Sequence, residues 1–228
     1  MNIPEKRSDS TRLALIHAGL ALFGECGFKG TTTRALSNHA GANISAIPYY
    51  FGGKKGLYLA VMEYIVLRMQ SHFGETQVLI SSLLSKQSIN KKDALNALKL
   101  MISSMAQIFV ESDEPKAWVQ LIMREQARPT EAFDIIYNGQ MVHIQHMYAS
   151  LIAVCTGLDP ESDEVKLRCH ALIGQILFFI LSRESLLRHL VVKKIQPEQI
   201  KLIYSILINH AEACLKIPLI EVETLDHE

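Results

Sequence analysis

The 228-residue sequence lacks a long apolar run, because no stretch of about 18 residues is free of charged and polar side chains. A membrane-spanning helix is therefore not predicted. Residues 1–9 are polar and contain no apolar core of a signal peptide, so we expect a cytoplasmic protein with no membrane partner. Cysteine is scarce: the four residues form no C-x-x-C pair, which predicts ordinary buried thiols rather than a zinc or redox motif.

Net charge is also absent, since 23 Lys and Arg residues balance 23 Asp and Glu residues. Their distribution is uneven: residues 1–60 hold seven basic and three acidic side chains, a net +4 that the remaining residues offset with −4. A basic end on an acidic body suits contact with phosphates through one part of the molecule. Gly-rich phosphate loops and the G-x-S-x-G and H-E-x-x-H motifs are missing, so an enzyme is not predicted. A helical enzyme or a passive interaction module is the competing class.

Signals for β-strands are missing as well, because no run alternates apolar and polar residues and no Asn-Gly or Asp-Gly turn joins two apolar runs. Helical periodicity predicts an all-α protein. Helices are expected at residues 54–73, 91–111, 115–127, 130–156, 162–190 and 197–215, with a loop or frayed end at 74–90. Prolines support four of these starts, since a first helical turn loses no hydrogen bond to proline. They are Pro115, Pro129, Pro160 and Pro197.

The first 53 residues predict three shorter helices. Apolar residues recur at helical spacing and mark one broad face of the first helix. They are Leu15, Ile16, Ala18, Gly19, Leu22 and Phe23. Gly24 and Gly27 are expected to close that helix. The threonines at 31–33 offer N-caps for a second helix that runs to Gly41, and Asn43 can cap a third.

A short helix, a Gly-containing turn and a second short helix within about 20 residues form a helix-turn-helix pattern. Here residues 33–40 are the support helix, 41–43 the turn and 44–50 the recognition helix, which a major groove is wide enough to admit. Thr33 can offer its hydroxyl and amide to a phosphate, and Lys54 can reach the same backbone as a point charge. The alternative is a small helical bundle with surface tyrosines and no role in DNA binding.

These residues resemble the TetR family of transcriptional regulators. The matching stretches are 22–37, 40–47 and 49–58, and the most specific part is the aromatic run at 49–51 followed by Lys54. The resemblance implies a three-helix DNA-binding domain, a larger helical ligand-binding and dimerisation domain, a homodimer, and release from operator DNA when a small-molecule effector binds. We place the domain boundary after residue 56, which gives domains at 1–56 and 57–228.

The resemblance also implies which residues contact DNA. They are Thr33, Asn43, Ile44, Ser45, Ala46, Tyr49, Tyr50 and Lys54. Of these, Ile44, Ser45 and Ala46 are expected at base edges, and Thr33, Tyr49 and Lys54 at phosphates. Ile47 and Phe51 are expected to pack the recognition helix onto the first helix.

Two departures from the family pattern concern the operator sequence rather than DNA binding itself. Ile44 stands where a polar or basic residue is frequent, so base recognition would lean on contacts with thymine methyl groups. Pro48 removes the amide that would bond to the Ile44 carbonyl. The recognition helix is therefore expected to end early or to tighten into a 3₁₀ turn.

The second domain resembles the CecR-like (CerR-type) branch of these regulators, which is associated with drug-resistance and transport genes. The matching stretches are 123–126, 129–133, 170–177 and 182–185. The helices at 162–190 and 197–215 are strongly apolar, so we predict that they form a four-helix interface in a homodimer. The alternative is that all of this apolar surface is intramolecular core.

We expect the effector pocket among the helices at 54–73, 91–111, 115–127 and 130–156, where methionines accumulate. The candidate lining residues are Met69, Met101, Met105, Trp118, Met123 and Arg124. Arg124 and Glu125 could supply the few polar groups that a pocket needs. Core packing of the methionines and an ion pair between Arg124 and Glu125 are the alternatives. A metal sensor is a further alternative, built from His143, His146, Cys169 and His170. Neither a metal nor another cofactor is predicted.

Overall fold

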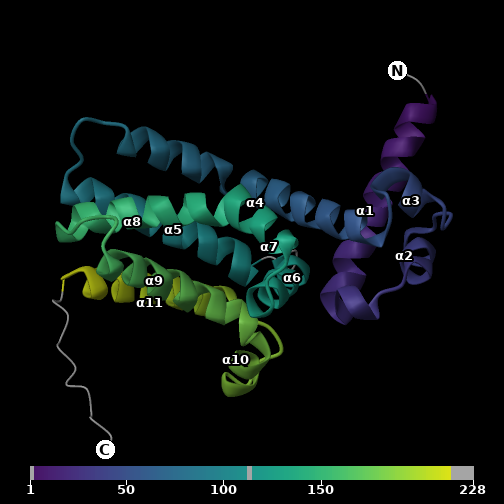
Figure 1. The fold of residues 1–228 in the computed structure, drawn as a ribbon. Helices are drawn as coiled ribbons and strands as arrows, with labels where there is room; N and C mark the ends of the chain where they lie inside the picture. Colours follow the sequence, from purple (N-terminus) through teal and green to yellow (C-terminus); the bar gives the residue numbers. More distant parts are fainter. Residues whose placement is uncertain (1–2, 112–114, 217–228) are drawn as a thin grey trace, which may run out of the picture. The chain divides into compact units, whose positions relative to one another are not determined.

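A computed structural model describes residues 3–111 and 115–216, and these two ranges contain helices and no strand (Figure 1). The all-α prediction is confirmed. Contacts divide the chain into two compact units, residues 3–78 with 115–144 and residues 79–110 with 145–216. This division by contacts differs from the boundary after residue 56, which separates two functions and stays a prediction.

The first unit opens with three helices and the start of a long fourth. These are α1 (Ile3–Gly30), α2 (Thr33–Ala40), α3 (Ala46–Phe51) and α4 (Lys54–Leu84). It is completed by α6 (Pro115–Ala127), α7 (Glu131–Ile136) and the π-helix η1 (Tyr137–Met141). Helix α1 packs against α2, α3 and α6, and α6 packs against α7. The three-helix arrangement at the N-terminus is therefore joined to α6 and α7 within one unit.

The apolar face predicted for α1 is confirmed, since Leu15, Ile16 and Phe23 are buried. The predicted end of this helix is wrong at Gly24, because helical structure continues to Gly30. Gly27 interrupts it with a φ of 71° and a ψ of 172°, a conformation that side-chain-bearing residues rarely adopt. The long part of α1 therefore ends at Gly27, as predicted, and a short helical segment follows it to Gly30.

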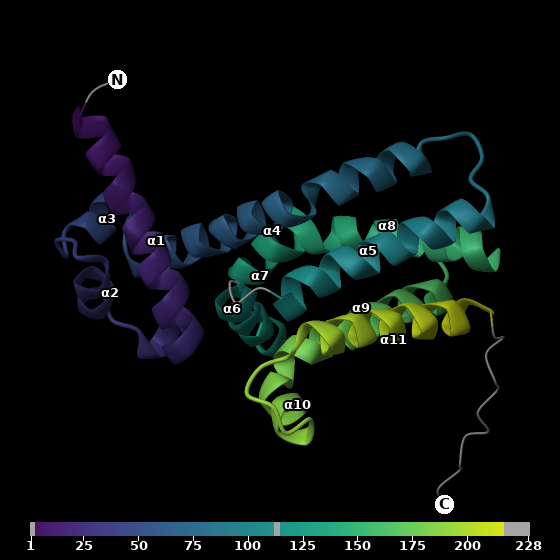
Figure 2. The same ribbon diagram turned by 180° about the vertical axis from the view of Figure 1, so that it is seen from behind.

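The second unit contains the end of α4 and the remaining helices. These are α5 (Lys91–Glu111), α8 (Val142–Thr156), α9 (Asp163–Leu181), α10 (Arg183–His189) and α11 (Pro197–Lys216). Helices α9 and α11 lie side by side in both views (Figures 1 and 2), and Arg168 of α9 donates to the Cys214 carbonyl of α11. Helices α5 and α8 meet in the core, where the Tyr148 hydroxyl lies 3.9 Å from the Met105 sulfur.

Two predicted boundaries need correction, and one predicted helix contains an irregular turn. The loop expected at 74–90 is helical as far as Leu84, because Phe73 and Ile80 are buried seven residues apart on α4. The helix expected at 162–190 breaks at Ser182 into α9 and α10, which are bent by 71°. The stretch 130–156 is continuous but contains η1, where the Val142 amide donates to the Tyr137 carbonyl five residues earlier.

In the part of the chain that the structure describes, no single helix has the length and apolar character needed to cross a membrane, and only the bent pair α9 and α10 meets that test jointly.

Candidate DNA-binding site and neighbouring cavity

The turn between α2 and α3 is built by local hydrogen bonds that the sequence encodes. Thr32 is the N-cap of α2, and its hydroxyl accepts a 3.1 Å hydrogen bond from the Ala35 amide. Gly41 ends α2 in the left-handed conformation, with φ 61° and ψ 29°, and its amide donates to the end of the helix. Thr33 therefore occupies the first turn of α2, with its amide free of the cap bond, as a phosphate contact requires.

Asn43 organises the entry to α3. Its side-chain oxygen accepts hydrogen bonds of 2.9 Å from both the amide and the hydroxyl of Ser45. The prediction that Asn43 caps the third helix is wrong, because the helix begins at Ala46 and its N-cap is Ser45; Asn43 instead orders the turn that precedes it. Because the Ser45 hydroxyl donates to Asn43, its lone pairs remain available to accept a hydrogen bond from a base edge.

The predicted DNA-contacting side chains form an exposed surface on α3 and the preceding turn. Tyr49 is 80% exposed and Ile44 is 52% exposed, whereas Ile47 on the opposite side is fully buried. Asn43 and Ser45 are also exposed, and Ala46 and Tyr50 are partly so. The predicted packing role of Ile47 is confirmed. The contacts of the exposed residues with DNA stay predictions.

Pro48 does not shorten the recognition helix. Helix α3 begins at Ala46, so Pro48 lies in the first turn, where the amide that it lacks has no obligatory helical partner. The next amide, that of Tyr49, donates to the Ser45 carbonyl at 3.2 Å, and the Pro48 carbonyl accepts from the Gly52 amide at 3.0 Å. The expectation of an early end or a 3₁₀ turn was wrong because the helix starts two residues later than predicted.

Lys54 is engaged within the protein rather than extended into solvent. Its ammonium donates to the carbonyls of Phe28 and Thr31 at 3.0 and 2.9 Å and lies 4.4 Å from the centre of the Phe28 ring. These contacts tie the start of α4 to the connection between α1 and α2. An ammonium has three donors, so one is left for the predicted phosphate contact. Arg34, on the first turn of α2, is a further exposed basic residue that the sequence prediction did not name.

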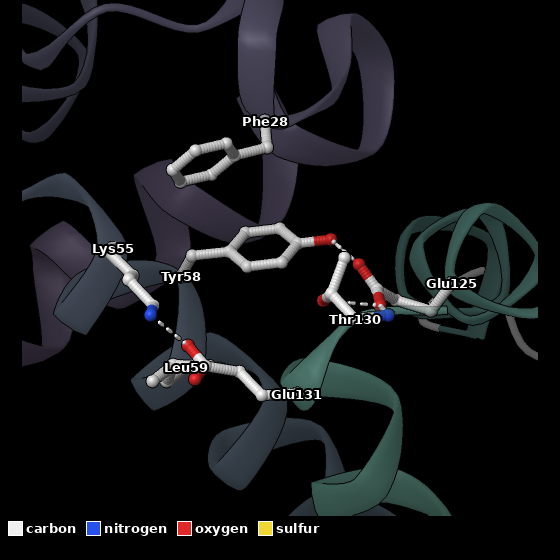
Figure 3. Close-up of a pocket in the computed structure, with 7 residues that line it drawn as sticks. All are labelled: Phe28, Lys55, Tyr58, Leu59, Glu125, Thr130 and Glu131. Atoms are coloured by element: carbon white, nitrogen blue, oxygen red, sulfur yellow. Dashed lines mark hydrogen bonds and ion pairs between the residues drawn. The ribbon is translucent and has the colours of Figure 1, made fainter. Parts of the chain in front are cut away.

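A cavity of about 360 Å³ lies in the same unit, between α1, α4, α6 and α7 (Figure 3). Its lining residues are Phe28, Lys55, Tyr58, Leu59, Glu125, Thr130 and Glu131. Small-molecule sites in proteins begin at about 300 Å³, so the cavity has room for a compact ligand. Of these residues, the sequence analysis considered only Glu125 as a polar group of the pocket, and none of the six candidate lining residues is among them. The sequence showed Thr130 as a helix start after Pro129, but no periodicity shows that α6 and α7 return to α4.

Glu125 is the polar centre of the cavity and is only 4% exposed. One carboxylate oxygen accepts a 2.7 Å hydrogen bond from the Tyr58 hydroxyl. The other accepts from the amide and the hydroxyl of Thr130, at 3.0 and 2.8 Å. Burial, together with the hydrogen bond to Glu125, raises the pKa of Tyr58 well above its usual value near 10. Three helices, α4, α6 and α7, therefore meet on one buried carboxylate.

Arg124, next to Glu125 on α6, has a structural role. Its guanidinium donates to the carbonyls of Gly24 and Glu25 at 3.2 and 2.9 Å, near the kink at Gly27. It does not line the cavity, and Glu125 bonds to Tyr58 and Thr130 instead. The ion pair considered between Arg124 and Glu125 is therefore not formed. Both residues connect α6 to the helices that precede it.

Comparison with known proteins identifies the family. The model for bacterial regulatory proteins of the TetR family matches residues 15–61. The model for the C-terminal domain of the HTH-type transcriptional dual regulator CecR matches residues 94–216. CecR of Shigella flexneri is 31% identical over 214 residues, which is 92% of this chain and 93% of that protein. The chain belongs to the TetR family, in its CecR branch. It is thus a transcriptional regulator with a DNA-binding helix-turn-helix.

Solved structures show the same fold. AibR, in a complex with isovaleryl coenzyme A and operator DNA, matches with a TM-score of 0.61 at 12% identity, over 88% of this chain and 97% of its own. A transcriptional regulator from Rhodococcus sp. Rha1 matches with a TM-score of 0.58 at 16% identity, over 91% and 99% of the two chains. The predicted fold class, an N-terminal helix-turn-helix followed by a helical domain, is confirmed.

The residues predicted to line an effector pocket in this TetR-family chain fall in both units. Met69 and Trp118 are buried in the first unit, with the Trp118 ring stacked on His72 at 6.3 Å. Met101 and Met105 are buried in the second. Each packs in the core of its unit, and a role in ligand binding stays a prediction.

The histidine and cysteine residues considered for a metal site are not gathered. Among residues 3–111 and 115–216, no three His, Cys, Asp or Glu side chains form a group that could hold a metal ion. Cys169 is buried and donates to the Gln145 carbonyl at 3.7 Å. The prediction that the thiols are buried holds for Cys169 but is wrong for Cys26 and Cys214, which are exposed.

Proposed function

We propose that this TetR-family chain is a homodimeric repressor that binds operator DNA through α2 and α3 and leaves it when a small molecule binds its helical domain. We further propose that it acts in the cytoplasm and controls efflux or transport genes, as its place in the CecR branch suggests. The observation that best supports a dimer is an exposed apolar stripe on α9. AibR, which was solved with both operator DNA and a ligand, supports control by a small molecule.

The stripe lies on the side of α9 opposite its buried residues. Its members follow alternating steps of four and three residues, the spacing by which one helix packs along another. They are Leu167, Ala171, Gly174, Phe178 and Leu181. Phe178 is 66% exposed, and a Cβ added at Gly174 would meet no atom within 4 Å. A large exposed aromatic ring beside a mid-helix glycine favours a second helix that approaches closely at this point.

Helix α11 carries a similar stripe beside that of α9. Its exposed members are Leu202, Ile206, Asn209 and Ala213, again at steps of four and three. Two helices from each of two subunits would bury these stripes in a four-helix interface with two-fold symmetry. A symmetric dimer presents two recognition helices, so it binds a pseudo-palindrome with half-sites about one helical turn, or a multiple of it, apart.

The dimer is tested by sedimentation velocity of the purified chain and of a Phe178→Glu variant. The parent is expected to sediment as a dimer and the variant as a monomer, because a charge in the centre of the interface is left unpaired. Leu79→Glu is the matched control, since Leu79 is a similarly exposed apolar residue of the same unit that lies on α4. A monomeric parent, or equal effects of the two substitutions, contradicts the proposal.

DNA binding is tested by footprinting on the DNA that flanks the gene, at two salt concentrations. We expect protection of a pseudo-palindrome of about two helical turns, with affinity falling steeply as salt rises because phosphate-bound counterions are released. Tyr49→Ala should weaken binding to all sequences alike, whereas Ser45→Ala should change preference at particular bases by about two- to tenfold. If Tyr49→Ala binds as tightly as the parent at physiological salt, the assigned docking is wrong.

Repression and release are tested by transcription in vitro from a promoter that contains the protected sequence. The parent is expected to lower transcript yield, and a monomeric Phe178→Glu variant to lose most of this effect, because one helix-turn-helix alone binds DNA weakly. A rise in transcript yield with the parent would mean activation rather than repression.

A further inference from the structure

The cavity between α1, α4, α6 and α7 contains the buried carboxylate of Glu125. Among the residues that the structure describes, no Lys, Arg or His side chain lies within ion-pair distance of Glu125, whose partners are Tyr58 and Thr130. A carboxylate that is 4% exposed and faces a cavity favours a positive ligand there. We propose that this cavity is a binding site for small organic ammonium ions that carry an aromatic or apolar group.

Charge around the cavity supports a cation over an anion. The lining includes two carboxylates, Glu125 and Glu131, and one ammonium, Lys55, which gives a net charge of −1. Lys55 forms a 2.7 Å ion pair with Glu131, in which both side chains are more than half exposed. Lys55 thus pairs with the carboxylate at the rim, whereas the interior carboxylate of Glu125 forms no ion pair with the residues that the structure describes.

Glu125 retains acceptor capacity for a ligand. A carboxylate has about four lone-pair directions, and the three hydrogen bonds to Glu125 use one on the first oxygen and two on the second. One direction on the oxygen that faces Tyr58 therefore remains. An ammonium group can donate to it without displacing Tyr58 or Thr130, so the contacts between the helices are kept.

The walls of the cavity suit a ring beside that ammonium. Phe28 and Tyr58 meet edge to face with their ring centres 5.1 Å apart, and Leu59 completes an apolar side (Figure 3). The ammonium of Lys54 lies 4.4 Å from the centre of the Phe28 ring, so this ring already takes part in a cation–π contact. A volume of about 360 Å³ corresponds to about twelve water molecules, which is enough for one substituted ring.

The position of the cavity gives the ligand a route to influence DNA binding. Its walls come from the end of α1 and the start of α4, which flank α2 and α3, and from α6 and α7. A ligand held there contacts both sets of helices in the same unit. This inference deepens the ligand control proposed above, but the site itself does not depend on which DNA the protein binds.

The test uses three probes that share one ring and one size and differ in charge: benzylamine, benzyl alcohol and benzoate. Their affinities for the full-length chain are measured by isothermal titration calorimetry at neutral pH and without DNA. We expect benzylammonium to bind at least tenfold more tightly than benzyl alcohol, and benzoate to bind most weakly. No binding of benzylamine at millimolar concentrations, or equal binding of benzylamine and benzyl alcohol, would overturn the proposal. Because DNA is absent, a failure of the proposed repressor function leaves this result unaffected.

Variants locate the site. Glu131→Gln, at the exposed rim, should lower the affinity for benzylammonium about fivefold or more. Lys55→Gln should raise this affinity, because a competing cation is removed. Phe28→Leu should lower the affinity for benzylammonium and should change the affinity for benzyl alcohol less. Glu75→Gln removes an exposed carboxylate from α4 outside the cavity and should have no effect. If Glu75→Gln and Glu131→Gln act alike, the attraction is due to overall charge and the site is refuted. These variants keep the buried contacts of Glu125, so they are expected to fold like the parent.

Discussion

The Tyr58 hydroxyl and the Glu125 carboxylate, 67 residues apart in sequence, are joined by a buried 2.7 Å hydrogen bond. Tyr58 lies in the second turn of α4, directly after the recognition helix, and Glu125 lies near the end of α6. A hydrogen bond to a buried charged group is among the stronger ones in proteins. The pair therefore connects the start of α4 directly to α6 by a hydrogen bond.

Removal of this hydroxyl is expected to destabilise the fold. Tyr58→Phe should lower the free energy of unfolding by about 2 kcal/mol, since it leaves a buried carboxylate with one donor fewer. Tyr64→Phe is the matched control, because the Tyr64 hydroxyl makes an exposed 3.1 Å contact with His17 and its loss should change stability by less than about 0.5 kcal/mol. Urea unfolding of the three proteins measures both values. Equal stabilities of the two variants would show that the buried bond contributes nothing.

A side chain at position 56 is expected to disrupt the DNA-binding helices. Gly56 lies in the first turn of α4, and a Cβ there would overlap the Phe51 carbonyl oxygen at the end of α3. Gly56→Ala should therefore displace α3, cost about 2 kcal/mol or more, and weaken DNA binding at least tenfold. Gly74→Ala on the same helix meets no atom within 4 Å and should stabilise the protein by up to about 1 kcal/mol. Thermal unfolding and DNA titration compare them, and a fully active Gly56→Ala would contradict the packing described.

Stability is expected to fall at alkaline pH through Tyr148. This residue is buried in the second unit, and burial raises the pKa of its hydroxyl far above the usual value of about 10. Below pH 10 the tyrosine is neutral in both the folded and the unfolded chain. Above pH 10 only the unfolded chain ionises, so stability is lost by up to about 1.4 kcal/mol per pH unit.

Comparison of the parent with Tyr148→Phe isolates this contribution. The variant should lose less stability than the parent between pH 10 and pH 11, because it has no hydroxyl to ionise. Tyr137→Phe removes a more exposed tyrosine and is expected to follow the parent. Urea unfolding at several pH values gives the slopes, and parallel slopes for the parent and Tyr148→Phe would refute the assignment.

The four thiols are expected to differ in reactivity. Burial raises the pKa of the Cys169 thiol to about 12, so at pH 8 it is both protonated and inaccessible. Cys26 is exposed and should react with a thiol reagent within minutes, whereas Cys169 should react only when the second unit unfolds. Mass spectrometry of peptides after brief labelling gives the order. Labelling of all four in denaturant is the control, and early labelling of Cys169 would show that the α8–α9 core opens readily.

Sequence signals located the DNA-binding helices because their boundaries depend on neighbouring residues. Thr32, Gly41 and Asn43 each act within a few positions, through a cap, a left-handed residue and a side-chain bond to the next turn. The resemblance to the TetR family then assigned a function, DNA binding, to this helix-turn-helix pattern. The error at Pro48 was one of register: a helix start shifted by two residues turns a disruptive proline into a tolerated one.

The cavity could not be predicted in the same way. Phe28, Tyr58 and Glu125 come from three helices, and only the return of α6 and α7 onto α1 and α4 brings them together. Helical periodicity predicts that a face is buried, but it does not predict what the face is buried against. The sequence allowed Glu125 either as a polar group of a pocket or as the ion-pair partner of Arg124, and its burial against Tyr58 and Thr130 became visible only in three dimensions.

The proline within α3 also affects how much conformational freedom the recognition helix has before it meets DNA. A proline fixes one backbone dihedral near its helical value, and the Tyr49 amide and the Pro48 carbonyl are already hydrogen-bonded within the protein. The segment therefore samples few other conformations in solution. Association with a major groove then orders little backbone, so the loss of chain entropy that opposes binding is small, and the same rigidity leaves the helix little scope to adapt to grooves of other shapes.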